Sequence, residues 1–262
     1  MTKIKVIGLI PSRIGSTRLP QKALLPINNL PLIIHTYRRA KLAKKLDDVI
    51  ICCDDYKIFS IAQKFKAKAV LTSKKHKNGT ERIYEAYNTI KKKYDLVVDI
   101  QGDEPLVSPI HIDKVISFHK ANFKYEIILP TIKLKSHINQ NLVKVITNMN
   151  DEVLYLSRAE IPFEHKDKKK FMNKHLSIIS FKPGALKRFA LNKETPLEKI
   201  EDIELLRALE INIKIKTVKL QGDSFSVDVL ADYLNAKKKC PMTNFLKNIK
   251  KANFDGKFRK YL

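Results

Sequence analysis

Three cations and several small hydroxyl residues share one short segment, LIPSRIGSTRLPQKAL, which runs from Leu9 to Leu24. Arg13, Arg18 and Lys22 supply its positive charge. Arginine presents a planar fork of donors to phosphate oxygens, whereas lysine presents a movable point charge. The segment therefore suits a strongly anionic ligand, although a solvated connecting loop would have the same composition.

A second polar segment, QGDEP, follows the apolar run LVVDI and contains Asp103 and Glu104. Carboxylates at the end of a buried strand can hold Mg²⁺, a hard ion that prefers oxygen ligands and keeps several waters beside substrate phosphates. Cations for phosphate and a carboxylate for metal together predict phosphoryl or nucleotidyl transfer. Taken alone, an acidic turn at a strand end is the commoner explanation of this segment.

The elements that must position these residues alternate in the first half of the chain. Helices with apolar residues at three- and four-residue spacing are expected at 32–46, 56–67 and 80–93. Largely apolar strands are expected at 3–11, 47–55, 67–73 and 95–103. This alternation predicts a parallel sheet with helices on both faces, whose ligands lie beyond the carboxyl ends of the strands. Four polar segments should meet at that edge, because each follows one of these strands.

The second half has a different pattern. Strands joined by turns are expected at 124–134, 142–150, 152–163 and 173–186, then a helix at 196–212, a strand at 213–220 and a helix at 228–239. The strands before residue 190 would add an antiparallel piece to the same sheet. We therefore predict an α/β fold with a mostly parallel central sheet, helices on both faces and an antiparallel β insertion.

The composition is that of a globular protein with a strongly basic surface. The chain has 262 residues and 44% apolar content, with 51 Lys and Arg against 27 Asp and Glu and a net charge of +24. The excess falls in short lysine runs without interleaved aromatics, so we favour a solvated surface over a nucleic-acid-binding face. No run is long enough to cross a bilayer and no secretory signal is evident, so we expect a cytoplasmic protein without membrane insertion. Three cysteines without a C-x-x-C spacing are expected to be buried free thiols.

The combined motifs resemble those of the 3-deoxy-manno-octulosonate (Kdo) cytidylyltransferases, also called CMP-Kdo synthetases. The family segments IPAR-x-x-STRLPGKPL, DHQSGTER and QGDEP correspond to IPSRIGSTRLPQKAL, KHKNGTER and QGDEP in this chain. Further matches are LVKVITNMNDEVLYLSRAEIP, KHLSI, IEDIELLRAL and SVDVLADYLNA, in the same order. The resemblance covers about residues 5–236.

The resemblance implies a Rossmann-like nucleotidyltransferase that joins CTP to a sugar acid, releases pyrophosphate and works as a homodimer with Mg²⁺. It implies one nucleotidyltransferase domain over 1–262, with a CTP-binding half at about 1–120, a sugar-binding and dimerisation portion at about 121–236, and a basic tail at 237–262. The expected product is a CMP-sugar for lipopolysaccharide or another surface polysaccharide.

The resemblance also assigns residues to roles. The catalytic residues would be Arg13, Lys22 and Asp103, and Asp103 and Asp228 would hold Mg²⁺. The residues expected to bind CTP are Ser12, Arg13, Arg18, Lys22, Asn78, Gly79, Thr80 and Gln101. Those expected to bind the sugar acid are Arg82, Arg158, His175 and Glu204.

Two of these residues have a simpler explanation that stays open. A single histidine beside a strand is more often a satisfied polar residue than a ligand, but the position of His175 within KHLSI favours the functional role. An aspartate just before a helix is often its N-cap, so Asp228 could cap the helix at 228–239 as well as hold metal.

Two substitutions within the motifs bear on the sugar. Ile179 stands where the family motif has tyrosine, and Leu205 stands where it has glutamine. Losing hydrogen-bonding groups from a pocket for a polyhydroxylated substrate should change its preference. We therefore predict a substrate other than ordinary Kdo, such as a derivative modified on its side chain. The alternatives are a different sugar, such as a nonulosonic acid or a sugar phosphate, or a non-catalytic basic protein that binds nucleic acid.

Overall fold

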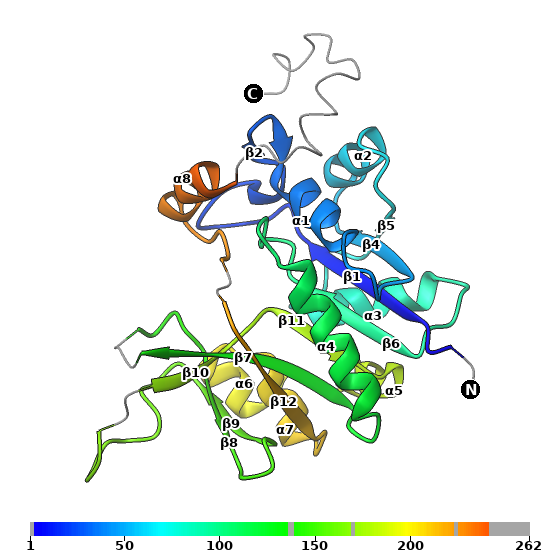
Figure 1. Cartoon of the computed structure of the whole chain (residues 1–262). Coiled ribbons are helices and arrows are strands. Elements are labelled where there is room, and N and C mark those ends of the chain that lie inside the picture. The colour runs from blue at the N-terminus through cyan, green and yellow to red at the C-terminus, as the bar shows by residue number, and fades with distance from the viewer. Residues whose placement is uncertain (1–2, 136–138, 169–170, 223–224, 241–262) are drawn as a thin grey trace.

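The structure is a computed structural model that describes residues 3–135, 139–168, 171–222 and 225–240. A twisted sheet forms its centre and helices cover both faces (Figure 1). The strands are β1 Val6–Ser12, β2 Pro26–Ile27, β3 Leu30–Pro31, β4 Asp48–Cys53, β5 Ala69–Leu71, β6 Leu96–Ile100, β7 Ile127–Lys135, β8 Lys144–Thr147, β9 Val153–Ser157, β10 Phe171–His175, β11 Ile178–Phe181 and β12 Ile215–Leu220. The helices are α1 Leu32–Ala40, α2 Tyr56–Lys64, α3 Gly79–Thr89, α4 Pro109–Ala121, α5 Pro183–Leu191, α6 Pro196–Glu201, α7 Leu205–Glu210 and α8 Leu230–Lys239, and a 3₁₀ turn, η1, spans Lys22–Leu24.

The sheet confirms the predicted mixture of parallel and antiparallel strands. Its order is β5-β4-β1-β6-β11-β7-β10-β8-β9, and β12 pairs with β7. β1 pairs in parallel with β4 and β6, as strands joined by helical crossovers do. β11 is antiparallel to both β6 and β7, and so attaches the later strands to the parallel part of the sheet. The carboxyl ends of β1, β4, β5 and β6 therefore face one edge.

Two apolar clusters pack against the opposite faces of this sheet. α1, α2 and α4 contribute to the first cluster, and α3, α5 and α7 contribute to the second. Cys53 belongs to the first and Cys52 to the second, because neighbouring side chains of a strand point to opposite faces. Both are buried free thiols, as is Cys240, which confirms that prediction.

A third, smaller cluster joins α8 to the start of the chain. Ile27 of the β2–β3 hairpin packs with Val227, Ala236 and Cys240. The Tyr233 hydroxyl donates to the Pro26 carbonyl at 2.6 Å. As Figure 1 shows, α8 consequently lies beside β2 and away from the strands that precede it in sequence.

Three helical segments differ from the sequence-based expectation. α4 was not predicted, although Ser108 caps it and Pro109 occupies its first turn. α5 begins at Pro183, within a segment expected to be a strand. The single helix expected at 196–212 is two short helices, because Asp202 adopts a left-handed conformation with φ 51° and ends α6.

A buried arginine connects the helices of the second face. Arg207 is 0% exposed and donates to Glu198 from Nε and Nη2, both at 2.6 Å. Its Nη1 donates to Glu81 at 3.0 Å, and its guanidinium lies over the Phe189 ring, 4.5 Å from the centroid. These partners belong to α3, α5 and α6, so one side chain of α7 holds four helices together.

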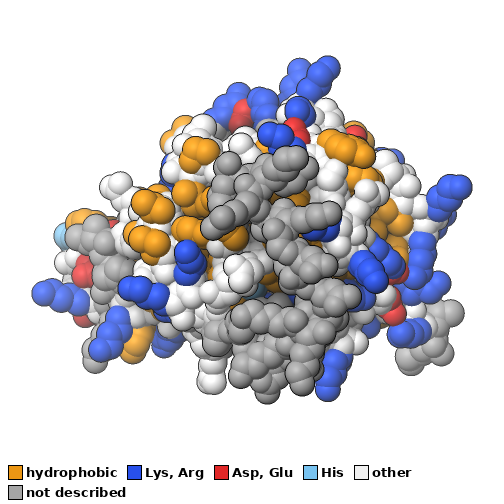
Figure 2. Space-filling model, turned by 90° about the horizontal axis from the view of Figure 1, so that it is seen from above, with side chains coloured by type: hydrophobic (Ala, Val, Ile, Leu, Met, Phe, Trp, Pro, Cys, Tyr) orange, Lys and Arg blue, Asp and Glu red, His pale blue; other side chains and the backbone are white. Residues whose placement is uncertain are grey.

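Positively charged side chains are dispersed on one face of the molecule. Figure 2 shows Lys and Arg side chains around the rim of one face rather than gathered in one stripe. Within the described part of the chain, no helix is both long and apolar enough to span a membrane. Most of the predicted basic tail, from residue 241 onward, lies outside the described residues.

Candidate active site

A cavity of about 400 Å³ opens at the edge where the parallel strands end. Polar segments after β1, β5 and β6 line it, as the sequence predicted, and the segment after β4 supports it from behind. All but three of the predicted site residues form its wall. The residues that do line the cavity are Ser12, Arg13, Arg18, Lys22, Asn78, Gly79, Arg82, Gln101, Asp103, Glu204 and Asp228.

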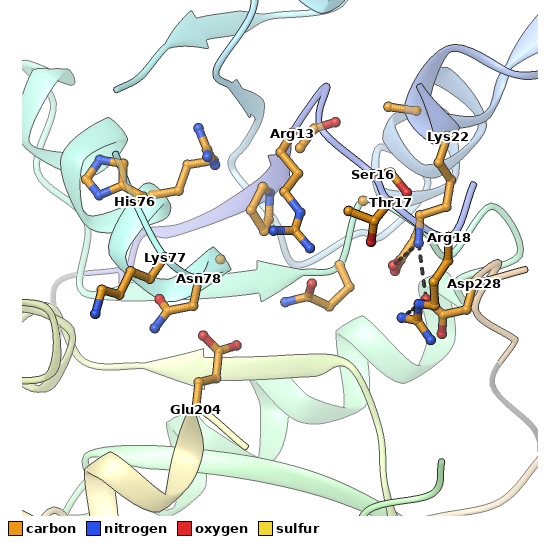
Figure 3. Close-up of a pocket in the computed structure, with 18 of the residues that line it drawn as sticks. Arg13, Ser16, Thr17, Arg18, Lys22, His76, Lys77, Asn78, Glu204 and Asp228 are labelled. Carbon is orange, nitrogen blue, oxygen red and sulfur yellow. Dashed lines mark hydrogen bonds and ion pairs between the residues drawn. The ribbon is translucent and has the colours of Figure 1, made fainter. Parts of the chain in front are cut away.

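The cationic loop after β1 forms one side of the cavity. The Ile14 N–H donates to Asp54 Oδ1 at 2.9 Å, which ties the loop to the end of β4. The Arg13 side chain points into the cavity, and Arg18 and Lys22 approach it from the other end of the loop (Figure 3). This is the arrangement expected of a loop that holds an anion.

Two carboxylates share one ammonium at the far end of this loop. Lys22 Nζ lies 2.8 Å from Asp103 Oδ2 and 3.2 Å from Asp228 Oδ1. Arg18 Nη2 also lies 3.0 Å from Asp228 Oδ1. The Val227 N–H donates to the Asp103 carbonyl at 3.0 Å, which fixes the segment before α8 against the QGDEP loop. Residues separated by two hundred positions therefore meet at one point.

Asp228 does not have the capping role that was left open. Val229 is the N-cap residue of α8, and it is the Asp232 carboxylate that accepts from the Asp228 and Val229 N–H groups. The Asp228 side chain is thereby left to face Arg18 and Lys22.

The segment before α3 is held by its own helix start. The Asn78 side chain caps α3 by accepting from the Glu81 N–H at 2.9 Å. Arg82, only 3% exposed, donates to Thr72 Oγ1 at 2.8 Å and to Asp54 Oδ2 at 3.2 Å. Arg82 thus connects the ends of β4 and β5 to α3 while reaching the cavity wall, a structural role beyond the sugar contact predicted for it.

The opposite wall is acidic. Glu204 extends into the cavity from the turn before α7 (Figure 3). Its carboxylate accepts from the Thr80 N–H at 3.3 Å. Burial raises the pKa of Glu204, and the Glu198 carboxylate raises it further. Gln101, on the same wall, donates from Nε2 to Asp99 Oδ2 at 3.0 Å.

Three predicted site residues lie behind the wall. Thr80 is fully buried. Arg158 donates from Nε and Nη2 to the carbonyls of Glu201 and Asp202, at 2.9 and 3.0 Å, and so binds the end of α6. His175 has a buried Nε2 without a hydrogen-bond partner among the described residues, and burial lowers its pKa to about 4.

The two substitutions expected to alter the sugar pocket lie in the core instead. Ile179 and Leu205 are each 2% exposed and pack in the second apolar cluster. Neither belongs to the cavity wall. The reason given for an altered sugar preference is therefore wrong, because apolar residues there contact other core side chains.

Several wall residues were not assigned from the sequence. Ser16 and Thr17 of the cationic loop, His76 and Lys77 before α3, and Asp202 all line the cavity. The first four belong to the cationic loop and to the KHKNGTER segment, which the sequence had already indicated as parts of the site. Their position beside predicted site residues was therefore the signal that could have identified them. Asp202 lies at the cavity wall because the helix is interrupted between α6 and α7. No glycine or proline in the sequence predicts this interruption.

A close approach between β1 and the QGDEP loop explains Gly102. A Cβ atom there would lie 2.4 Å from the Pro11 carbonyl oxygen and 3.1 Å from Ile33 Cδ1. We expect Gly102→Ala to lower the free energy of unfolding by about 1–3 kcal/mol, because the backbone at Pro11 or Gly102 would have to shift to make room for the added methyl group. Urea denaturation measures this. Gly184→Ala is the matched control, since its Cβ meets nothing within 4 Å; equal stability of the two variants would contradict the prediction.

Comparisons with known proteins agree with this geometry. The family model described as cytidylyltransferase matches residues 7–215. A 3-deoxy-manno-octulosonate cytidylyltransferase from Thermodesulfovibrio yellowstonii is 40% identical over 248 residues, which cover 89% of this chain and 97% of the relative. An 8-amino-3,8-dideoxy-manno-octulosonate cytidylyltransferase from Shewanella oneidensis is 38% identical over 234 residues, which cover 87% and 96%.

A solved structure supports the same relationship. It is that of CMP:2-keto-3-deoxy-manno-octonic acid synthetase complexed with CTP, which matches with a TM-score of 0.84 at 28% identity and covers 89% of this chain and 97% of that one. The family resemblance seen in the sequence motifs and the predicted nucleotidyltransferase fold are thus confirmed. The chain belongs to the cytidylyltransferase family, as a CTP-dependent nucleotidyltransferase of the group that contains the 3-deoxy-manno-octulosonate cytidylyltransferases.

Proposed function

We propose that this protein transfers the cytidylyl group of CTP to the anomeric hydroxyl of 3-deoxy-manno-octulosonate or its 8-amino-3,8-dideoxy relative. The hydroxyl oxygen forms a bond to the α-phosphorus, and the bond from that phosphorus to the bridging oxygen breaks. Pyrophosphate leaves and a CMP-sugar remains. The observation that carries the proposal is the cavity itself, with a cationic loop on one side and an acidic wall on the other.

The cationic loop would bind the triphosphate. Arg13 points into the cavity, and Lys22 and Arg18 stand at its far end. Positive groups fixed in this way stabilise the charge that develops on a leaving pyrophosphate. The backbone of the loop is held by Asp54, and the Arg18 and Lys22 side chains are held by the two carboxylates, before the substrate arrives.

We propose Asp103 and Asp228 as the residues that would hold Mg²⁺. Their fit rests on Lys22, whose ammonium shows that both carboxylates reach one cation. Mg²⁺ is commonly held by one or two carboxylates together with substrate phosphates and waters. When bound, it supplies charge neutralisation for the phosphates and lowers the pKa of an attacking hydroxyl. Among the described residues no group of three or more His, Cys, Asp or Glu is placed to hold a metal, so substrate and water would complete the coordination.

We also propose that the protein works as a homodimer through its second half. Large apolar side chains are exposed there, namely Met149 at 100%, Leu154 at 59% and Phe163 at 84%. Exposed apolar side chains of this size commonly mark interfaces. Sedimentation velocity measures the assembly state, and a monomer at micromolar concentration would refute the proposal.

The function is tested by one reaction. Pyrophosphate release from CTP should require an added sugar acid and Mg²⁺, and CMP-sugar should accumulate in equal amount. The released sugar nucleotide would serve lipopolysaccharide or another surface polysaccharide. Release that is independent of the sugar, or no release with either octulosonate, would refute the proposed activity.

A further inference from the structure

The far end of the cationic loop is an ion-pair cluster whose members come from three distant segments. Lys22 Nζ lies 2.8 Å from Asp103 Oδ2 and 3.2 Å from Asp228 Oδ1. Arg18 Nη2 lies 3.0 Å from the same oxygen of Asp228. The Lys22 side chain is 16% exposed, whereas that of Arg18 is 63% exposed. Lys22 is therefore the inner cation of the cluster, and its ammonium bridges both carboxylates.

The Lys22 ammonium takes up the position that a divalent cation on these carboxylates would need. Mg²⁺ contacts its oxygen ligands at about 2.0–2.1 Å and tolerates little departure from that geometry. The ammonium already donates to one oxygen of Asp103 and to one oxygen of Asp228. A metal on either oxygen would lie within a few ångströms of the ammonium, and two cations at such a distance repel each other strongly where water is partly excluded. Lys22 and a metal ion therefore compete for the same two carboxylates.

The balance of charge at this end of the cavity favours Lys22 until an anion arrives. The loop brings the three positive charges of Arg13, Arg18 and Lys22, against the two negative charges of the carboxylates. A divalent cation would add to this positive excess. A triphosphate reverses the sign of the balance, because it brings several negative charges at once. The ammonium of Lys22 can follow those charges, since it is a point charge on a flexible four-carbon stem.

We propose that Lys22 is a tethered substitute for the metal ion, which holds Asp103 and Asp228 together in the free protein and leaves them when a triphosphate binds. Its ammonium then pairs with phosphate oxygens, and the two carboxylates become available to a divalent cation. The nucleotide-free protein consequently binds divalent metal weakly, and the metal site forms only together with the bound nucleotide. This inference rests on the proposed function, because it concerns the metal site proposed there.

The experiment measures metal binding by the whole protein without nucleotide or sugar. Mn²⁺ takes the same oxygen ligands as Mg²⁺, and its unbound fraction is followed by electron paramagnetic resonance during a titration. Lys22→Met removes the ammonium and keeps an unbranched side chain. The variant should bind Mn²⁺ at least about tenfold more tightly than the wild-type protein, because the metal no longer has to displace charge-assisted hydrogen bonds from both carboxylates.

Arg13→Met is the matched control. Arg13 belongs to the same loop and lines the same cavity, but among the described residues it forms no ion pair with Asp103 or Asp228. The control loses the same charge without uncovering a carboxylate, so its gain in Mn²⁺ affinity should be clearly smaller than that of Lys22→Met. Equal gains in the two variants would overturn the proposal, because the change in net charge would then explain both.

Two further measurements establish where the metal binds and that the variants are folded. Adding Asp103→Asn to Lys22→Met should remove the gain in affinity, and a gain that persists would overturn the proposal by placing the metal elsewhere. Melting temperatures are recorded with and without Mn²⁺, because a ligand that binds only the folded state stabilises it. Mn²⁺ should raise the melting temperature of Lys22→Met more than that of the wild-type protein. Lys22→Gln, measured alongside, should show a gain of the same sign.

Failure of the inference is distinct from failure of the proposed function. The titration requires no turnover, and pyrophosphate release from CTP is measured separately. If that release requires a sugar acid and Mg²⁺, but the wild-type protein binds Mn²⁺ as tightly as Lys22→Met does, the proposed function stands and only the inference is overturned. If Lys22→Met does not bind Mn²⁺, the assignment of Asp103 and Asp228 to the metal is wrong and the inference falls with it.

Discussion

Asp103→Asn is expected to lower kcat/KM by at least about 100-fold while leaving the protein folded. The substitution keeps the shape of the side chain but removes one of the two negative charges that Lys22 now bridges. The proposed Mg²⁺ site would lose one of its two protein ligands, and even changes behind a metal ligand commonly cost 10–100-fold. Initial rates of pyrophosphate release should be measured across a range of Mg²⁺ concentrations, together with the melting temperature.

The control is the same change of charge elsewhere on the protein. Asp167 is exposed and outside the cavity wall, so Asp167→Asn should retain the wild-type rate. Asp228→Asn should resemble Asp103→Asn, because the two carboxylates act on the same cation. A wild-type rate and an unaltered Mg²⁺ dependence for both site variants would remove the metal assignment.

Arg207→Met should destabilise the protein by about 3–5 kcal/mol, because it leaves the buried Glu198 carboxylate and the partly buried Glu81 carboxylate without their cation. Arg207 is fully buried and contacts Glu198 through two nitrogens at 2.6 Å. For a chain of this size the loss corresponds to a fall in melting temperature of roughly 6–20 °C. Calorimetry or urea denaturation measures it.

Arg188→Met provides the comparison for an exposed pair. Arg188 Nη1 lies 2.8 Å from Glu126 Oε1, but its side chain is 48% exposed. Exposed ion pairs contribute about 0–1 kcal/mol, so this variant should remain close to wild type. An equal decrease in the free energy of unfolding of the two variants would mean that burial does not determine how much Arg207 contributes to stability.

The parallel half of the fold and most of the cavity follow from local signals in the sequence. Apolar runs separated by helical periods predicted β1, β4, β5 and β6 and the helices between them. The polar ends of these strands meet because parallel strands share one carboxyl edge. Arg13, Lys22 and Asp103 were placed correctly at that edge for this reason.

The errors occurred where long-range contacts decide the structure. At the end of α6 the carbonyls of Glu201 and Asp202 accept hydrogen bonds from Arg158, which is more than 40 positions away in the chain. Nothing within the segment itself predicts that the helix ends at this point. Ile179 was assigned to the pocket from its motif, but alternation along β11 directs it into the core opposite Asp99. The buried Asp99 was overlooked because, in a sequence, it appears as one polar residue within an apolar strand.

Asp228 follows Lys22 by 206 residues, so the cavity cannot be completed early in translation. Ribosomes add about 5–20 residues per second, which separates the two residues by roughly 10–40 s of synthesis. The cationic loop and Asp103 emerge first, and the segment that brings Asp228 to them emerges near the end, held by α8 against the β2–β3 hairpin. We expect nascent and truncated chains to be inactive, so that a cell does not consume CTP on unfinished copies of the enzyme.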